Sequence, residues 1–394
     1  MWAQVIREER FGEPISAFAV EKIEVPALGP DDVLVCVLAA GINYNNVWAA
    51  RGFPVDVIKE QRRDGDRSDF HIGGSDASGI VFATGSAVTG LAVGDPVVVH
   101  PGMWDARCPL IQAGGDPITS PTARNWGYDT NWGSFGQFAR VQAHQCLPKP
   151  PHLTWEEAAA YMLVTATAYR MLLGWPPHTV RERDVVLVWG GAGGVGSQAI
   201  QITRELGGLA VAVVSSEDKG AFCVKLGAKG FIDRRAFSHW GPMPDWRDTR
   251  AYNRWAAGAR GFNRAIWEVV GERRDPRIVV EHPGEDTIPT SIFVCDRAGM
   301  VVICGGTSGY QGVLDLRHLW TRQKRLQGSH FANDEQCRGA NELVARGRLD
   351  PCLSRVFRFD EIPLAHQLLH EGKQPPGNMA ALVGAPRPGL TGLP

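Results

Sequence analysis

Three glycines with the spacing G-x-G-x-x-G stand between a short apolar run, residues 185–189, and a segment that can open a helix, residues 198–202. Glycines at this spacing let the backbone approach a pyrophosphate, and the N-terminus of the following helix offers amide donors and partial positive charge. The pattern therefore predicts a dinucleotide site and, with it, redox chemistry. The candidate cofactor-binding residues of this turn are Gly191, Gly193, Gly194, Val195 and Gly196.

A second predicted strand, residues 209–214, indicates which dinucleotide is used. An acidic residue at its end would hold a ribose 2′-hydroxyl and select NAD, whereas hydroxyl groups and cations suit a 2′-phosphate. Glu217 and Asp218 favour NAD, and Lys219 has the alternative role of a solvated lysine at a helix start. The serines and cations together favour NADPH, and the residues predicted to bind it are Ser215, Ser216, Lys219 and Arg234.

The composition narrows the class of protein. A chain of 394 residues is long enough for two domains with substantial cores, and a net charge of −1 gives no bulk attraction to nucleic acid or an anionic membrane. No apolar stretch reaches the roughly 20 residues of a membrane span, and the first residues lack a signal-peptide pattern. None of the eight cysteines forms a C-x-x-C pair. These features predict a cytoplasmic enzyme without a nucleic-acid or membrane partner.

The elements that must position this chemistry divide the chain into three segments. Residues 1–150 have a β-rich pattern, residues 151–325 alternate strands and helices, and residues 326–394 predict a return to the first domain. In the first segment we expect strands at 32–40 and 79–85, a turn that leads into another strand at 94–100, and an irregular loop at 101–126. Further on we expect a helix at 154–160 capped by Thr154 and Glu157, helix and loop at 236–264, helices at 334–347 and 360–372, and a poorly ordered tail at 385–390.

Several short motifs along the whole chain carry a family resemblance: Asn43–Trp48, Trp126–Asn131, Leu153–Ala160, Val280–Gly284, Thr307–Tyr310 and Gly328–Asn333. With the glycine turn, they resemble the crotonyl-CoA carboxylase/reductase branch of the medium-chain dehydrogenase/reductase superfamily. The resemblance implies an α/β fold, in which a GroES-like β-rich catalytic domain is split around a Rossmann domain with a doubly wound parallel sheet. It also implies a homodimer or homotetramer.

The same resemblance predicts a site without metal. Zinc alcohol dehydrogenases of the superfamily carry a catalytic cysteine and a Gly-His-Glu motif. Here Asn43 falls near the cysteine position, and Gly73–Asp76 replaces the motif. Without thiolate or imidazole ligands a catalytic zinc has nothing to hold it. This favours hydride addition to an activated C=C bond.

The resemblance implies that hydride from NADPH reaches the β-carbon of a 2-enoyl thioester, and that a proton or CO2 then traps the enolate. By motif, Asn45 and His330 match the asparagine and histidine that hold CO2 in the family. Both can donate hydrogen bonds to oxygens that gain negative charge. A capping Asn45 and a core His330 are the structural alternatives.

The chain departs from the family at one pair, because Tyr128 and Asp129 replace its Phe-Glu. Aspartate is one methylene shorter than glutamate, and a misplacement of that size can cost about 10²-fold in rate. A phenol can deliver a proton to an enolate. Our hypothesis from the sequence is therefore that the enzyme reduces its substrate and carboxylates poorly or not at all.

A CoA ester needs cations for its phosphates, and the residues predicted to supply them are Arg317, Arg322 and Lys324. In the resembled family the arginine matching Arg317 contacts CoA. A solvated basic helix face is the alternative, and an acyl-carrier-protein substrate would use similar charges. Other readings of the whole chain are a zinc-free quinone or enone reductase, a reductive cyclase, and a non-catalytic NADPH-binding partner.

Overall fold

The computed structural model describes residues 1–392 of the 394-residue chain and divides into two compact units. The first unit contains Met1–Ala166 and the chain from Phe331 onward, and the second contains Thr167–His330. The domain boundaries that the sequence predicts, near residues 150 and 325, stay predictions. Each unit has its own sheets and its own hydrophobic core, as the predicted fold class requires.

The first unit is built on a seven-stranded sheet with the order β10-β6-β5-β3-β18-β17, in which β9 also pairs with β3. Smaller sheets have the orders β2-β1-β4 and β7-β8. The strands are β1 (Trp2–Ile6), β2 (Phe18–Lys22), β3 (Asp32–Ile42), β4 (His71–Ile72), β5 (Ala77–Thr84), β6 (Pro96–Val99), β7 (Gly102–Met103), β8 (Arg124–Asn125), β9 (Phe138–Gln142), β10 (Cys146–Pro148), β17 (Leu353–Phe357) and β18 (Asn378–Leu382).

The long apolar strand β3 organises this sheet because it pairs antiparallel with β5, β9 and β18. Its side chains contribute to hydrophobic clusters, with Val33, Val35 and Val37 in one and Ala40 and Ile42 in another. The expected strands at 32–40, 79–85 and 94–100 are confirmed as β3, β5 and β6, shifted by a few residues at their ends. The expected loop at 101–126 holds only short elements.

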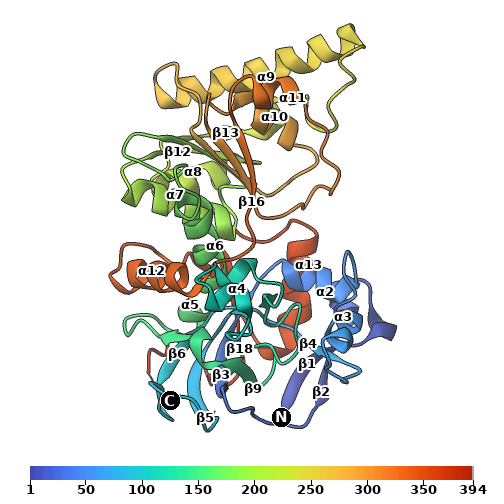
Figure 1. Ribbon diagram of the computed structural model, residues 1–394, viewed down its shortest axis with the longest axis vertical. Coiled ribbons are helices and arrows are strands. Elements are labelled where there is room, and N and C mark those ends of the chain that lie inside the picture. The colour runs from blue at the N-terminus through green and yellow to red at the C-terminus, as the bar shows by residue number, and fades with distance from the viewer. Residues whose placement is uncertain (393–394) are drawn as a thin grey trace. The chain divides into compact units, whose positions relative to one another are not determined.

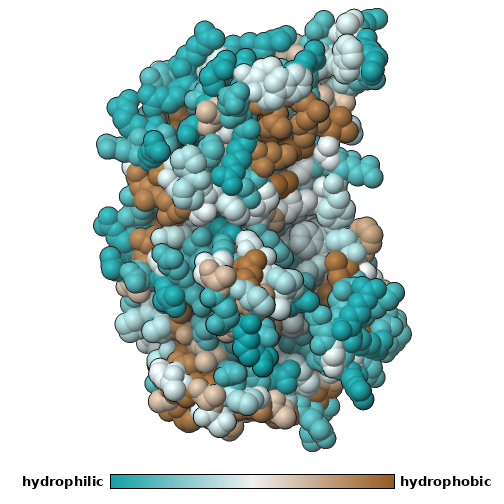
Figure 2. All heavy atoms as spheres, in the orientation of Figure 1, coloured by the Kyte–Doolittle hydropathy of each residue, from teal (hydrophilic) through white to brown (hydrophobic). Residues whose placement is uncertain are grey.

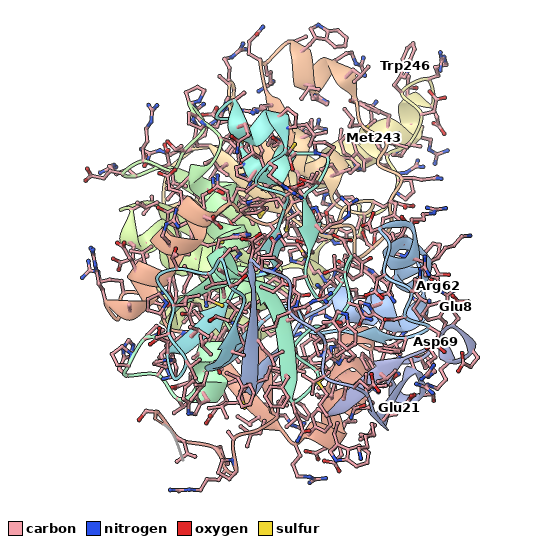
Figure 3. All side chains as sticks on the ribbon, turned by 60° about the horizontal axis from the view of Figure 1, so that its bottom comes forward. Glu8, Glu21, Arg62, Asp69, Met243 and Trp246 are labelled. Atoms are coloured by element: carbon pink, nitrogen blue, oxygen red, sulfur yellow. The ribbon has the colours of Figure 1, made fainter. Side chains whose placement is uncertain are left out.

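The helices of the first unit are α1 (Pro14–Ala17), α2 (Asn45–Arg51), α3 (Val57–Arg63), α4 (Pro109–Gln112), α5 (Trp155–Ala159), α12 (Asp334–Ala345) and α13 (Ile362–His370), while α6 (Met162–Leu173) runs across the boundary. The predicted cap of α5 is confirmed: the Glu157 amide donates to Thr154 Oγ1 at 3.3 Å and the Thr154 amide donates to Glu157 Oε2 at 2.8 Å. On the surface Arg62 pairs with Glu8 at 2.6 Å (Figure 3).

The prediction of a poorly ordered tail is wrong. Ala385 is buried, the Trp155 amide donates to the Leu390 carbonyl at 2.9 Å, and the Gly389 amide donates to Glu156 Oε1 at 2.6 Å. The indole of Trp155 also donates to the Gly392 carbonyl at 2.7 Å. The proline- and glycine-rich composition of the tail suggested mobility, but these contacts fix it on α5.

The second unit is a six-stranded parallel sheet with the order β13-β12-β11-β14-β15-β16. Its strands are β11 (Val185–Trp189), β12 (Leu209–Val214), β13 (Gly230–Asp233), β14 (Ile278–Glu281), β15 (Met300–Ile303) and β16 (Arg325–Gly328). Helices connect them: α7 (Gly194–Glu205), α8 (Glu217–Lys225), α9 (Thr249–Val270), α10 (Ile288–Val294) and α11 (Leu316–Trp320). This is the predicted doubly wound order, with β11 and β14 at the switch point.

Helices cover both faces of this sheet. Figure 1 shows α7 and α8 on one side and α9, α10 and α11 on the other. Phe262 and Ile266 of α9 and Ile292 of α10 pack in one cluster with Leu187 and Val211 of the central strands. The segment predicted as helix and loop at 236–264 is confirmed in kind, although α9 continues for 22 residues to a left-handed Gly271.

Candidate functional site

The glycine turn has the geometry of an anion site. Strand β11 ends at Trp189, Gly193 caps α7, and the Ser197 amide donates to the Gly193 carbonyl at 2.9 Å. A Cβ on Gly191 would lie 2.8 Å from Ala212 Cβ, and a Cβ on Gly196 would overlap the carbonyl oxygen of Gly190. The glycine spacing therefore lets the turn pack against β12 and against the start of α7, where the first amides have no helical partner.

Ser215, Ser216, Lys219 and Arg234 lie at the ends of two neighbouring strands. Val214 of β12 is in register with Asp233 of β13, so Ser215 and Arg234 leave the same edge of the sheet. The Lys219 ammonium donates to Ser215 Oγ at 3.4 Å, and Ser216 caps α8. Arg234 is exposed, whereas Arg235 pairs with Asp233 at 2.5 Å. Hydroxyl groups and cations thus gather where a 2′-phosphate would be recognised.

Glu281 and His282, at the end of β14, support the glycine turn, and sequence reasoning gave them no role. Glu281 accepts hydrogen bonds from Ser291 Oγ at 2.5 Å and Thr287 Oγ1 at 2.8 Å, and Ser291 Oγ accepts from Trp189 Nε1 at 2.8 Å. Burial raises the pKa of Glu281 to about 7. A Cβ on Gly190 would overlap His282 Nε2. The only sequence signal was the motif Val280–Gly284.

In the first unit Asn45 belongs to a group of side chains at the start of α2. Its Nδ2 donates to Ser75 Oγ at 2.7 Å, and its Oδ1 accepts from Asn46 Nδ2 at 3.0 Å. Next to this pair, Asn43 Nδ2 donates to Asp76 Oδ2 at 2.9 Å, and the Leu163 amide donates to Asp76 Oδ1 at 2.8 Å. Complete burial raises the pKa of Asp76 to about 8. Asn45 is therefore a fixed, partly exposed amide beside a buried carboxyl group.

Tyr128 and Asp129 lie in a tight turn of the same unit. The Asp129 amide donates to the Asn125 carbonyl at 2.8 Å, and the Asn125 amide donates back to Asp129 Oδ2 at 2.7 Å. The ring of Tyr128 is buried, with its centroid 6.4 Å from that of Trp48. The short carboxylate of Asp129 thus closes its own turn, and it borders a surface cavity of about 500 Å³.

His330 is the last residue of the second unit, whereas Asn45, Tyr128 and Asp129 belong to the first. It follows β16 by two residues, and its side chain is exposed. The exposure contradicts the structural alternative of a core histidine, and the catalytic role stays a prediction.

The three cations proposed for CoA have different environments. Arg317 is exposed, pairs with Asp315 at 2.6 Å, and lies 5.8 Å from the ring centroid of Trp246 (labelled in Figure 3). The Arg317 guanidinium is the main reason that the pKa of Asp315 lies far below its usual range. Arg322 is exposed just after α11. Arg322 is therefore the better placed of the two for an anionic ligand, because the Arg317 guanidinium already binds the Asp315 carboxylate.

The structure gives Lys324 another role. Its ammonium is buried and donates to the carbonyls of Ile292 at 2.6 Å and Phe293 at 3.2 Å, near the C-terminus of α10. Burial lowers the pKa of Lys324 to about 8. A cation that caps a helix from the interior is not free to meet a phosphate, and the pattern of basic residues in the sequence could not distinguish it from its exposed neighbours.

Comparisons with known proteins agree with this geometry. Residues 29–151 match the model of the alcohol dehydrogenase GroES-like domain, and residues 194–346 match that of zinc-binding dehydrogenases. Both units therefore place the chain in the medium-chain dehydrogenase/reductase superfamily. Crotonyl-CoA carboxylase/reductase of Cereibacter sphaeroides is 50% identical over 99% of this chain and 89% of its own length. The chain belongs to the crotonyl-CoA carboxylase/reductase family.

Two solved structures and one further relative are informative. Crotonyl-CoA carboxylase/reductase AntE in complex with NADP is 58% identical, with a TM-score of 0.96 over 98% of this chain and 95% of that one. The 2-octenoyl-CoA carboxylase reductase CinF, in complex with NADP and 2-octenoyl-CoA, is 36% identical, with a TM-score of 0.91 over 99% of this chain and 89% of that one. Crotonyl-CoA reductase of Streptomyces avermitilis is 38% identical over 96% of this chain and 84% of its own length.

The zinc named in one of these family models does not fit the residues present. Around Asn43 the available groups are carboxamides, a serine hydroxyl and the Asp76 carboxyl, and each already has a hydrogen-bond partner. Zinc in enzymes of this kind needs thiolate or imidazole ligands. The residues around Asn43 therefore do not form a zinc site of this kind.

A second group with metal-binding residue types, His100, His144 and Asp334, is a hydrogen-bond network. His100 Nδ1 accepts from the Gly102 amide at 3.2 Å, so its proton lies on Nε2, 3.1 Å from Asp334 Oδ1. His144 Nδ1 lies 2.9 Å from the same oxygen. The nitrogen that would bind a metal on His100 thus carries a proton.

Among residues 1–392 no helix has the length and apolar character needed to cross a membrane.

Proposed function

We propose that this chain reduces a 2-enoyl-CoA with NADPH, adding hydride to the β-carbon. The observation that carries the proposal is the glycine turn between β11 and α7, built so closely that Gly191 and Gly196 admit no side chain. Family membership supports the same activity, since relatives and solved neighbours are named for crotonyl-CoA or 2-octenoyl-CoA. Ser215, Lys219 and Arg234 at one sheet edge support NADPH over NADH.

The residues of the chain then determine what happens to the enolate. Bound NADPH supplies the hydride. Asn45 offers an amide N–H to an oxygen that gains charge, and His330 can donate in the same way. Tyr128 brings a phenol that can deliver a proton to the enolate, while the carboxylate of Asp129 is short and closes its own turn. The relatives named carboxylase/reductases favour CO2 capture. We propose that CO2 is captured and that the Tyr128–Asp129 pair opens a competing protonation branch.

Product analysis tests both parts. Mass spectrometry would follow NADPH oxidation with crotonyl-CoA, 2-octenoyl-CoA, the matching acyl-carrier-protein ester and a free enone, each with and without bicarbonate. We expect NADPH oxidation with the CoA esters and a mixture of carboxylated and directly reduced products when bicarbonate is present. Turnover of the free enone alone would overturn the enoyl-CoA proposal. Absence of the carboxylated product would overturn CO2 capture and support the sequence-based hypothesis in its stronger form.

We further propose that the protein is a homo-oligomer assembled through the free edge of the second unit's sheet. Strand β16 ends the strand order, and apolar side chains near it are exposed on β16, on α11 and before α11: Tyr310, Val313, Leu316, Trp320 and Leu326. Figure 2 shows hydrophobic surface over α10 and α11. An unpaired edge with apolar neighbours is suited to pairing with a second copy.

Light scattering tests the assembly. We expect a mass of at least two 42.9-kDa chains, and a Leu326→Lys variant that dissociates to a smaller species while keeping its folded signal. A monomeric wild type, or an unchanged mass for the variant, would contradict the interface.

We also propose a reducing compartment, the cytoplasm, as the location of the protein. The eight cysteines are all free, which supports this proposal.

A further inference from the structure

Asn46, the residue after Asn45 on α2, has a completely buried side chain whose amide is used at both ends. Its Nδ2 donates to Asn45 Oδ1 at 3.0 Å, and its Oδ1 accepts from the Gly74 amide at 3.0 Å. In the sequence, only its place in the motif Asn43–Trp48 marks this residue. It makes the side-chain contact that joins Asn45 to the backbone of the Gly73–Gly74 turn.

The hydrogen bond from the Gly74 amide to Asn46 sets the direction of the hydrogen bonds that join Asn46, Asn45 and Ser75. The backbone amide of Gly74 can only donate, so Asn46 must turn its oxygen toward Gly74 and its NH2 group toward Asn45. Asn45 must then present its oxygen to Asn46 and its nitrogen to Ser75 Oγ. Ser75 takes one N–H of Asn45, which leaves the second N–H of this partly exposed residue to donate elsewhere.

The Gly74 amide, the first donor in this series of hydrogen bonds, is held in place by its own backbone contacts. Gly74 has a φ of +97°, a conformation that favours glycine, and its carbonyl accepts from the Ser134 amide at 3.0 Å. A Cβ on Gly73 would overlap Asn46 Oδ1, and a Cβ on Gly74 would overlap Ser134 Oγ. The two glycines therefore bring the turn close enough to hold Asn46 in one orientation.

We propose that Asn46 is a positioning residue that keeps the Asn45 carboxamide turned with its free N–H, and not its oxygen, toward the reacting group. This inference rests on the proposed role of Asn45 in holding CO2. An N–H stabilises the negative charge that grows on the CO2 oxygens as the C–C bond forms, whereas a carbonyl oxygen in its place repels that charge. Asn46 thus acts on the fate of the enolate and not on hydride transfer.

The Asn46→Asp variant tests the inference because it preserves shape and reverses polarity. One introduced oxygen still accepts from Gly74, but the other cannot donate to Asn45, so Asn45 turns and donates to it. We expect NADPH oxidation with crotonyl-CoA to stay within about 3-fold of the wild type. We expect the carboxylated share of the product to fall, or the KM for bicarbonate to rise, by roughly 10-fold, the size of a lost orientation effect.

The pH dependence separates positioning from a structural defect. A protonated carboxyl group accepts through its C=O and donates through its O–H, so it reproduces the polarity of the native amide. Burial raises the pKa of such a group toward neutrality. We expect the carboxylated share of Asn46→Asp to recover between pH 8 and pH 6, relative to the wild type at each pH.

Asn131→Asp is the matched control, since Asn131 is 4% exposed in the same unit and its side chain hydrogen-bonds to Phe70, Ile72 and Trp132. It should leave the product ratio unchanged, and thermal unfolding should verify that both variants fold. A wild type that carboxylates, together with an Asn46→Asp variant that matches it at every pH, would overturn the inference alone. A wild type that never carboxylates would overturn the CO2 role of Asn45, and this inference with it.

Discussion

At the scale of single residues, close packing accounts for the identity of the glycines better than flexibility does. Gly196 has an ordinary helical place in α7, yet a Cβ there would overlap the Gly190 carbonyl. Asn45 and Asn46 show the same principle for polar groups, because one backbone amide sets the orientation of two side chains. Chemistry at this scale depends on which atoms neighbouring segments allow.

Gly196→Ala should damage the cofactor site without altering the substrate cations. The added methyl group must push α7 away from Gly190, so we expect the Kd for NADPH to rise more than 10-fold and the free energy of unfolding to fall by about 2 kcal/mol. Isothermal titration and urea denaturation measure the two effects. Gly261→Ala is the control, because a Cβ on Gly261 of α9 would meet other atoms no closer than 3.8 Å, and the variant should be neutral or slightly stabilising. Unchanged NADPH affinity in Gly196→Ala would refute this account of the turn.

Arg234→Ala should reduce the preference for NADPH over NADH. Loss of a cation beside Ser215 removes a partner for the 2′-phosphate, so we expect the KM for NADPH to rise about 10-fold while the KM for NADH stays the same. Arg235→Ala is the matched control, since Arg235 is held by Asp233. If Arg234→Ala and Arg235→Ala had the same effect on the KM for NADPH and on the KM for NADH, the 2′-phosphate site would have to lie elsewhere.

At the scale of elements, buried polar groups join the ends of strands and helices. Glu281 connects β14 to α10 through Ser291, and Ser291 binds Trp189 at the end of β11. Lys324 caps α10 from the segment before β16. These contacts keep the edge of the sheet at the glycine turn rigid, which is where a dinucleotide is bound in this fold.

Glu281 should make stability depend on pH. Its pKa is about 7 in the folded protein against 4.5 for the free side chain, so between these values the folded state holds a proton that the unfolded state has lost. Its contribution is therefore fully present below pH 4.5 and is lost as the pH rises through 7. We expect the difference in Tm, Glu281→Gln minus wild type, to rise between pH 5 and pH 8. A constant difference would contradict the assigned titration.

Lys324→Met and Arg322→Ala should separate structure from substrate binding. Replacing Lys324 leaves two carbonyls of α10 without their donor, so we expect stability to fall by about 1–2 kcal/mol while the KM for crotonyl-CoA is unchanged. Arg322→Ala should raise that KM several-fold and leave the Tm unchanged. Steady-state kinetics and calorimetry decide the matter, and a raised KM in Lys324→Met alone would restore it as a CoA ligand.

At the scale of the whole molecule, the sequence was informative where a pattern is local. The glycine turn, strand β3 and the Thr154–Glu157 cap follow from spacing and residue type within a few positions. Other features depend on residues far apart in the chain or on a neighbouring turn. They are the burial of Lys324, the docking of the tail on Trp155 and the Asn46–Gly74 contact. No periodicity marks such contacts, because tertiary packing alone decides them.

The central claim is that this family member delivers hydride from NADPH to the β-carbon of an enoyl-CoA. The most direct measurement is turnover of crotonyl-CoA with NADPH deuterated at both C4 positions, with NMR and mass spectrometry of the acyl-CoA product. The account predicts one deuterium per molecule, located at the β-carbon, in both carboxylated and reduced products. Deuterium at the α-carbon, or a product without deuterium, would contradict it.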